Sequence, residues 1–178
     1  MYLKLLPRSA FLGVVTSLSL ASVALLGEVS FAGPDCLDND GAVIPVINEQ
    51  VVAWKTSTPN SYRARAHILG SLIRHYPDHS GHHHLEVSLG ANSQSTIEVI
   101  YNEDFGAIPD YQPGSVIEAC GDYITAMAQA GPYPPSPDGA IIHWVHRSPN
   151  LNKHPSGYLT IDGVICGNNA ENAGPKPQ

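Results

Sequence analysis

Short apolar runs alternate with turn-forming clusters along most of the chain after residue 61. The runs are rich in Ile, Val, Leu and Tyr, and the clusters contain Gly, Pro, Asn and Asp at 77–81, 90–95 and 109–114. This alternation is typical of consecutive β-strands joined by turns. It predicts strands near residues 64–75, 83–89, 96–102, 115–124, 139–145 and 157–166.

This number of short strands predicts a mainly β domain over residues 62–167. Five to six strands in about 100 residues favour a small closed β-barrel, OB-like, over a two-sheet sandwich. Residues 33–61 mix turn formers with two brief apolar patches, and they predict an irregular lead-in with one turn of helix at most. Residues 168–178 contain no large apolar side chain, which predicts a disordered tail.

The first 32 residues have the pattern of a signal peptide. Lys4 and Arg8 precede an uncharged apolar run over 10–26, and Ser30 and Ala32 form a small-x-small cleavage pattern. A retained membrane anchor is the alternative, but the uncharged stretch is barely long enough to span a bilayer. We therefore predict cleavage after Ala32 and a periplasmic or secreted protein without a membrane span.

Charge and cysteine content narrow the function further. The chain has a net charge of −7, and loss of residues 1–32 makes it one unit more negative. An acidic protein lacks the basic stripe that binds phosphates, which disfavours nucleic acid as a partner.

In an oxidising compartment, Cys36, Cys120 and Cys166 predict one disulfide and one free thiol. Three pairings are open, and we favour Cys36 with Cys166, which would join the two ends of the domain.

The nine histidines carry the candidate chemistry, and they are unevenly placed. Four lie within 79–84, and three more are His143, His146 and His154. Imidazole binds transition metals and titrates near neutral pH, so such clusters suggest a metal site or acid–base chemistry. Zn and Cu are the candidate metals.

Strand alternation predicts where two of these histidines point. Leu85, Val87 and Leu89 would share the core face, which leaves His84 accessible on the other face. His143 and His146 are three residues apart, so both can serve one site only if the strand ends between them. The turn-like sequence after His146 favours such an ending. Trp144 shares a strand face with Ala140 and Ile142, so a packing role comes first and ligand stacking second.

The segment His143-Trp144-Val145-His146 resembles the His-Trp-Thr-His motif of the uncharacterised bacterial family called domain of unknown function 3465. The resemblance extends to Pro149, His154 and Gly157-Tyr158 after the motif, to Gly81-His82-His83-His84 and Asn102 before it, and to Gly121-Asp122-Tyr123, and covers about residues 64–166. The sequence departs from the family at Leu85, Tyr101 and Val145. The resemblance implies a small exported bacterial protein and singles out His84, His143, His146 and His154. The other five histidines are then predicted to be solvated.

Three classes of function follow for this histidine-lined surface. The first is a ligand-binding or structural envelope protein whose site contains His84, Asn102, His143, Trp144, His146 and His154, with an unknown small ligand or envelope component as the partner. The second is a metal-dependent hydrolase of the phosphodiesterase or nuclease type, with three of His84, His143, His146 and His154 as metal ligands. The third is a metal carrier or sequestering protein. Asn102 more often makes a turn than binds a ligand, and we rank that turn role first.

Overall fold

The computed structural model describes residues 33–166, and these form a mainly β structure with one short helix. The predicted signal peptide and the predicted C-terminal tail lie outside the described residues. In chain order the elements are α1 (Asn48–Ser57), β1 (Arg63–His79), β2 (His82–Ser88), β3 (Thr96–Asn102), the 3-10 helix η1 (Glu103–Phe105), β4 (Val116–Thr125), β5 (Ala140–His143), β6 (Tyr158–Ile161) and β7 (Val164–Cys166).

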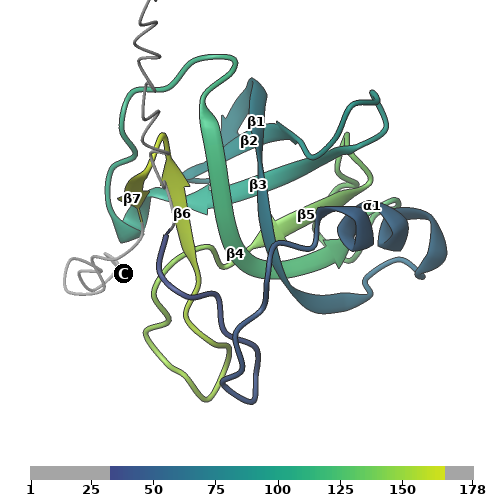
Figure 1. The fold of residues 1–178 in the computed structure, drawn as a ribbon. Helices are drawn as coiled ribbons and strands as arrows, with labels where there is room; N and C mark the ends of the chain where they lie inside the picture. Colours follow the sequence, from purple (N-terminus) through teal and green to yellow (C-terminus); the bar gives the residue numbers. More distant parts are fainter. Residues whose placement is uncertain (1–32, 167–178) are drawn as a thin grey trace, which may run out of the picture. The chain divides into compact units, whose positions relative to one another are not determined.

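The seven strands form one sheet in the order β1-β2-β3-β5-β4-β6-β7, and β1 also pairs with β4. Five strands therefore form a ring in the order β1-β2-β3-β5-β4, with β6 and β7 added along β4 (Figure 1). All neighbours are antiparallel except β3 and β5, which are parallel. The parallel pair places the ends of β3 and β5 at the same rim of the ring.

The ring closes because β1 is long enough to pair with two strands. Its first half, from Arg63 to Ser71, pairs with β4, and its second half, from Ser71 to His79, pairs with β2. Gly70 lies where β1 changes partner, and a Cβ atom there would lie 2.2 Å from the carbonyl oxygen of Ser88. A residue without a side chain therefore allows β1 to pass close to the end of β2.

The core lies inside the ring and is formed by alternate residues of each strand. Leu85, Val87 and Leu89 are all buried, as strand alternation predicts. They pack with Ile97, Val99 and Tyr101 of β3, Ile117, Ala119 and Tyr123 of β4, and Ala140 and Ile142 of β5. The predicted strands thus match the observed ones closely, except that the stretch predicted at 157–166 is two strands, β6 and β7, joined at Asp162 and Gly163.

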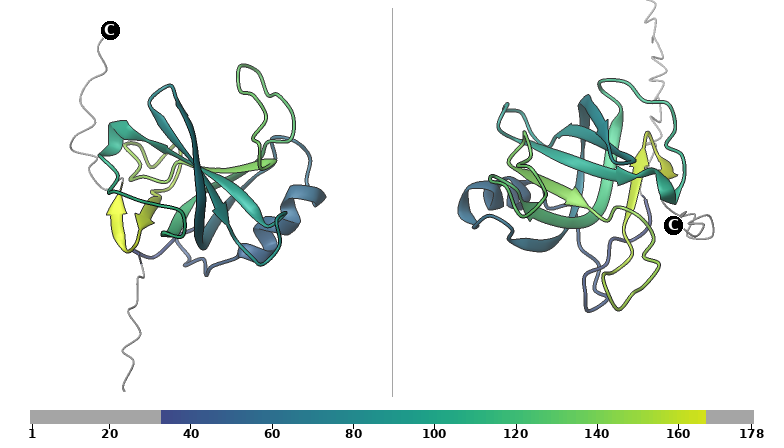
Figure 2. Two further views of the ribbon diagram at one scale, coloured as in Figure 1. Left: turned by 90° about the horizontal axis from the view of Figure 1, so that it is seen from above. Right: turned by 180° about the vertical axis from the view of Figure 1, so that it is seen from behind.

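The region predicted as an irregular lead-in contains the ten-residue helix α1, so the expectation of one turn at most is wrong. The helix packs against β1 and β4 (Figures 1 and 2). Val51 is fully buried, and the ring of Trp54 lies 5.1 Å from that of Tyr123. Paired valines have a low intrinsic helix propensity, and burial of one side of the helix compensates for it. No helix among residues 33–166 is long and apolar enough to cross a membrane.

The disulfide joins Cys36 to Cys120, so the predicted pairing of Cys36 with Cys166 is wrong. Cys166 is a free, buried thiol. The expectation of one disulfide and one thiol is confirmed. The pairing differs because the N-terminal segment runs beside β4, where Cys120 lies opposite His67 of β1, whereas Cys166 packs into the main core from β7.

Candidate ligand-binding site

The site is built where β5 ends. The strand stops at His143, and the next residue, Trp144, has a left-handed backbone with a φ of 54°. Such a conformation is rare for a bulky residue and breaks the alternation of side chains. Val145, rather than Trp144, then enters the core, and His143 and His146 face one site. The strand ending predicted between these two histidines is confirmed.

Six rings follow one another without a gap at this rim, and we call them the ring wall. They belong to three separate segments: His82 at the start of β2, Phe105 in η1 after β3, and His143, Trp144, His146 and His154 from the end of β5 and the following loop. The distances between ring centroids are 5.9 Å for His82–His143, 4.7 Å for His143–Trp144, 5.6 Å for Trp144–His154, 5.6 Å for His154–His146 and 3.5 Å for His146–Phe105.

Trp144 belongs to this wall and not to the hydrophobic core, so of the packing role ranked first, in the core or under the loop, only packing under the loop remains. It is partly exposed, its ring stacks on that of His154, and the guanidinium of Arg63 lies 5.1 Å from its centre. A partly exposed tryptophan in contact with an imidazole and a cation is a candidate stacking surface.

Backbone carbonyls determine which nitrogen of three wall histidines carries the proton. The Nδ1 atom lies 2.9 Å from the Ser80 oxygen in His82, 2.9 Å from the Arg147 oxygen in His146, and 3.0 Å from the Pro155 oxygen in His154. A carbonyl only accepts hydrogen bonds, so each Nδ1 donates. In the neutral rings Nε2 therefore carries the lone pair and can accept a hydrogen bond or bind a metal ion.

His84 lies beside the wall on the outer face of β2. Its Nδ1 contacts Oε1 of the buried Glu98 at 2.5 Å. Its Nε2 is buried and has no hydrogen-bond partner among the described residues. The ring is thus less accessible than strand alternation predicts, because β3 and the neighbouring rings cover it.

The interior of the cluster favours uncharged imidazole. Burial, followed by the positive charge that His82, His146, His154 and His84 could carry, lowers the pKa of His143 to about 4. Burial also lowers the pKa of His146. Both rings are therefore neutral at pH 7, and a neutral imidazole can accept a hydrogen bond or bind a metal ion.

His84, His146 and His154 lie close enough to His143 for their charges to lower its pKa, so the four histidines belong to one cluster. Their ligand atoms are not gathered for a metal ion. Among the described residues, the only three His, Cys, Asp or Glu side chains with ligand atoms all within 4.8 Å of one another are His75, Asp78 and His83. Metal binding by the four predicted histidines stays a prediction.

Asn102 ends β3 and caps η1. Its side-chain oxygen accepts a hydrogen bond from the backbone N–H of Asp104 at 2.9 Å. The turn role ranked first from the sequence is confirmed, and a ligand contact by Asn102 stays a prediction.

Four of the histidines expected in solvent are held by the protein, namely His67, His75, His82 and His83. His67 is mostly buried, with Nδ1 2.9 Å from the Ile44 oxygen and Nε2 2.8 Å from Oε1 of Glu118. His82 belongs to the ring wall, and it could have been found from the sequence because strand alternation places it on the same face as His84. Phe105 had no comparable signal, since only the fold brings η1 to His146.

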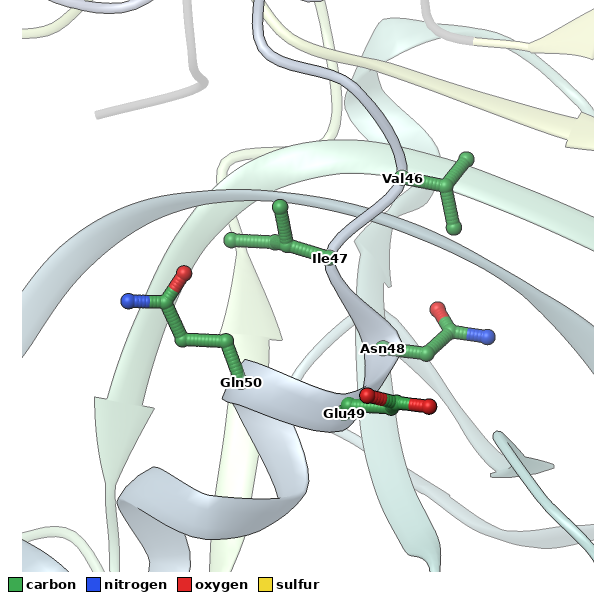
Figure 3. A pocket seen from close by; sticks show the side chains of 5 residues that line it. All are labelled: Val46, Ile47, Asn48, Glu49 and Gln50. Carbon is green, nitrogen blue, oxygen red and sulfur yellow. The ribbon is translucent and has the colours of Figure 1, made fainter.

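Two surface hollows lie away from the ring wall. One, of about 400 Å³, lies at the start of α1 and is lined by residues 46–50 (Figure 3). Figure 3 shows these side chains pointing in different directions around the chain. Another, of about 430 Å³, lies beside the loop at 90–93 and contains the ion pair of Arg74 with Glu86. Neither contains a wall residue.

Comparison with protein-family models finds no match for the chain, and comparison with curated proteins finds none either.

Proposed function

We propose that this is an exported ligand-binding protein, and that its ligand lies against the ring wall. The observation that carries the proposal is the unbroken series of six rings contributed by three segments at one rim, of which only His146 is buried. A structural core would surround these rings with aliphatic side chains, whereas here they contact one another beside Arg63. The disulfide and the signal-like N-terminus support export.

The ring order β1-β2-β3-β5-β4, with β3 parallel to β5, supports an OB-like barrel as the finer description of the fold. Barrels of this type bind oligosaccharides and oligonucleotides on the face of strands 2 and 3 and on adjoining loops. The ring wall begins on β2 and includes residues that follow β3 and β5. Membership of the family of domain of unknown function 3465 is likewise our proposal, based on the motif around Trp144.

The chemistry of the wall favours a sugar chain over a nucleic acid. Flat rings stack on the apolar faces of sugar rings, and the Nε2 lone pairs of His146 and His154 can accept hydrogen bonds from hydroxyl groups. A nucleic acid would bring one negative charge per nucleotide to a protein whose net charge is −7. We therefore infer a glycan of the cell envelope as the ligand class.

Tryptophan fluorescence tests this proposal because the chain has only two tryptophans. Trp54 packs against Tyr62 and Tyr123, so Trp54→Phe leaves Trp144 as the only tryptophan reporter. We expect chitotetraose or soluble peptidoglycan glycan strands to change this fluorescence saturably, and a thymidine oligonucleotide not to. His154→Ala and Arg63→Ala should weaken binding by about tenfold or more, and the exposed His79→Ala should not. No saturable change with either glycan would reject the proposal.

The buried Nε2 of His84 favours a transition-metal site in the same cluster as a second candidate. Its Nδ1 contacts Glu98, and outer carboxylates of this kind orient metal-binding histidines. Such a site would require the Nε2 atoms of His84, His146 and His154 to come together around one ion. Such a site supports either the hydrolase or the metal carrier considered from the sequence. Tight Zn²⁺ binding that is lost in His84→Ala and His154→Ala, without glycan binding, would favour it.

A further inference from the structure

We propose that His75, Asp78 and His83, at the end of the β1–β2 hairpin, form a binding site for a divalent transition-metal ion, distinct from the ring wall. This site goes beyond the proposed glycan binding and does not depend on it.

The strand pleat separates this site from the wall. In the run His82-His83-His84, alternate side chains point to opposite faces of β2. His82 and His84 lie on the outer face. His83 lies on the inner face, where its ring stacks on that of the buried Tyr101 at 6.4 Å and 13°. One run of three histidines therefore contributes to two different groups.

A bulge in β1 brings Asp78 to the inner face. His75 is paired with Leu85, whose side chain is in the core, and so it points inward. Strict alternation would turn Asp78, three residues later, outward. The pairing register shifts between Tyr76 and His79, which is the effect of a bulge, and Asp78 contacts both inner histidines.

The three candidate ligand atoms lie close together, at hydrogen-bonding distances around Oδ1 of Asp78. Oδ1 of Asp78 lies 2.6 Å from Nε2 of His75 and 3.1 Å from Nδ1 of His83, and all three atoms lie within 4.8 Å of one another. Bonds of about 2.0–2.1 Å in a tetrahedral site place ligand atoms about 3.3 Å apart. Small adjustments would therefore admit an ion between them.

The second nitrogen of each imidazole is also held. Nδ1 of His75 lies 3.0 Å from the hydroxyl of Tyr111, and Nε2 of His83 lies 2.9 Å from Oε1 of Glu103. Metal-binding histidines commonly use the second nitrogen in this way, which fixes the ring and its tautomer. The rings are thus oriented before any ion binds.

His83 supplies the sharpest argument for a cation. Its two nitrogens face two carboxylates, those of Asp78 and Glu103. A neutral imidazole has one N–H and can donate to only one of them. A metal ion between His83 and Asp78 satisfies the other contact. Protonation of the ring would do so as well, and the experiment separates the two explanations.

Solvent can reach the ion from one side. The side chain of Asp78 is 46% exposed and that of His75 is 31% exposed, whereas His83 is 15% exposed. Three protein ligands and an open side leave a coordination position for water. Two imidazoles and one carboxylate suit Zn²⁺ and similar divalent ions.

Co²⁺ is a suitable probe because its visible absorption reports coordination. The full mature protein, without a tag, with its disulfide intact and stripped of metal by a chelator, would be titrated with Co²⁺ and then with Zn²⁺. We expect a tetrahedral or five-coordinate Co²⁺ spectrum that Zn²⁺ displaces. Asp78→Asn and His83→Gln should weaken binding by about tenfold or more, because each removes one of three ligands.

Two control variants separate this site from other imidazoles. His79→Gln changes a histidine of the same hairpin outside the triad, and His154→Gln changes the ring wall; both should keep the affinity of the wild type. Thermal unfolding without metal identifies any variant that fails to fold. A wild type that binds no Co²⁺ overturns the proposal. So does a Co²⁺ affinity of Asp78→Asn and His83→Gln that equals the affinity of the wild type. The glycan-binding assay, performed with a chelator present, tests the proposed function separately, and its result does not depend on whether this metal site exists.

Discussion

His143 shows how a position in the fold changes the chemistry of a single residue. The side chain is partly buried among four other imidazoles, and these surroundings disfavour its charged form. The low pKa of His143 affects stability. Between pH 6.5 and about 4, the His143 side chain is protonated in the unfolded chain and neutral in the folded chain. Folding is then opposed whenever the pH lies below the ordinary pKa of imidazole.

The free energy of unfolding should therefore fall as the pH drops from about 6.5 to about 4. Above this window both states are neutral at His143, and below it both are charged, so the change is confined to it. The shift of the His143 pKa to about 4 corresponds to about 3 kcal/mol at most. Urea unfolding at several pH values measures it.

His143→Gln removes the titrating group and should flatten this part of the profile. The exposed His79→Gln is the matched control and should keep the slope of the wild type. An identical slope in wild type and His143→Gln would show that His143 titrates normally in the folded protein.

At the scale of elements, the loop between β5 and β6 determines the shape of the ring wall. It carries Trp144, His146 and His154, and it is held at its base by backbone contacts. The N–H of Gly157 donates to the His146 oxygen at 2.7 Å, and Arg65 donates to the Ser156 oxygen and to the Leu37 oxygen of the N-terminal segment. Figure 1 shows this loop and the N-terminal segment extending from the same side of the sheet.

Gly157→Ala should destabilise the protein and disturb the wall. A Cβ atom there would lie 2.3 Å from the carbonyl oxygens of both Cys120 and Trp144, so the backbone must move on two sides. We expect a loss of about 2 kcal/mol or more in the free energy of unfolding. Weaker glycan binding should accompany it.

Gly90→Ala is the control for this change, because its added Cβ would meet only the side chain of Ser95, at 3.2 Å. Gly90→Ala should lower the free energy of unfolding less than Gly157→Ala does, and it should leave the fluorescence of Trp144 unchanged. Equal stability of the two variants would mean that the base of the loop can relax.

At the scale of the whole molecule, the disulfide ties the N-terminal segment to strand β4 of the ring. Cys36 and Cys120 are 84 residues apart in the sequence. Beside them, Tyr158 donates to Oε1 of Glu118 at 2.8 Å, and Gly33 donates to Oε2 of the same carboxylate at 2.8 Å. The segment is thus held by a covalent bond and by a buried polar network.

Reduction of the disulfide should lower the melting temperature. Closing so long a loop restricts the unfolded chain, and the expected contribution is about 4 kcal/mol. Cys36→Ala should reproduce the loss, whereas Cys166→Ala should retain the disulfide. Thiol counting on unfolded, unreduced protein should find one thiol, and three would contradict the bond.

The sequence by itself determined the strands and the outline of the site. Alternation of apolar and polar residues is a local property, so the positions of most strands and the core face of Leu85 and Val87 followed from it, whereas the turn-like sequence after His146 indicated that β5 ends before that residue. The choice of His84, His143, His146 and His154 as site residues came from the family resemblance, and only the tertiary structure brought them into one cluster. Closure of a ring needs pairing between distant strands, and only the tertiary structure provided it.

Tertiary structure also decided which partners meet. Cysteine spacing contains no information on which thiols approach, so the bond from Cys36 to Cys120 depended on the path of the N-terminal segment. The helix α1 has a weak intrinsic helix propensity, and it forms because Val51 and Trp54 pack against the sheet. Phe105 and Asp78 reach their histidines through a neighbouring loop and a bulge, because contacts between distant segments and shifts of register are set by packing and not by local sequence.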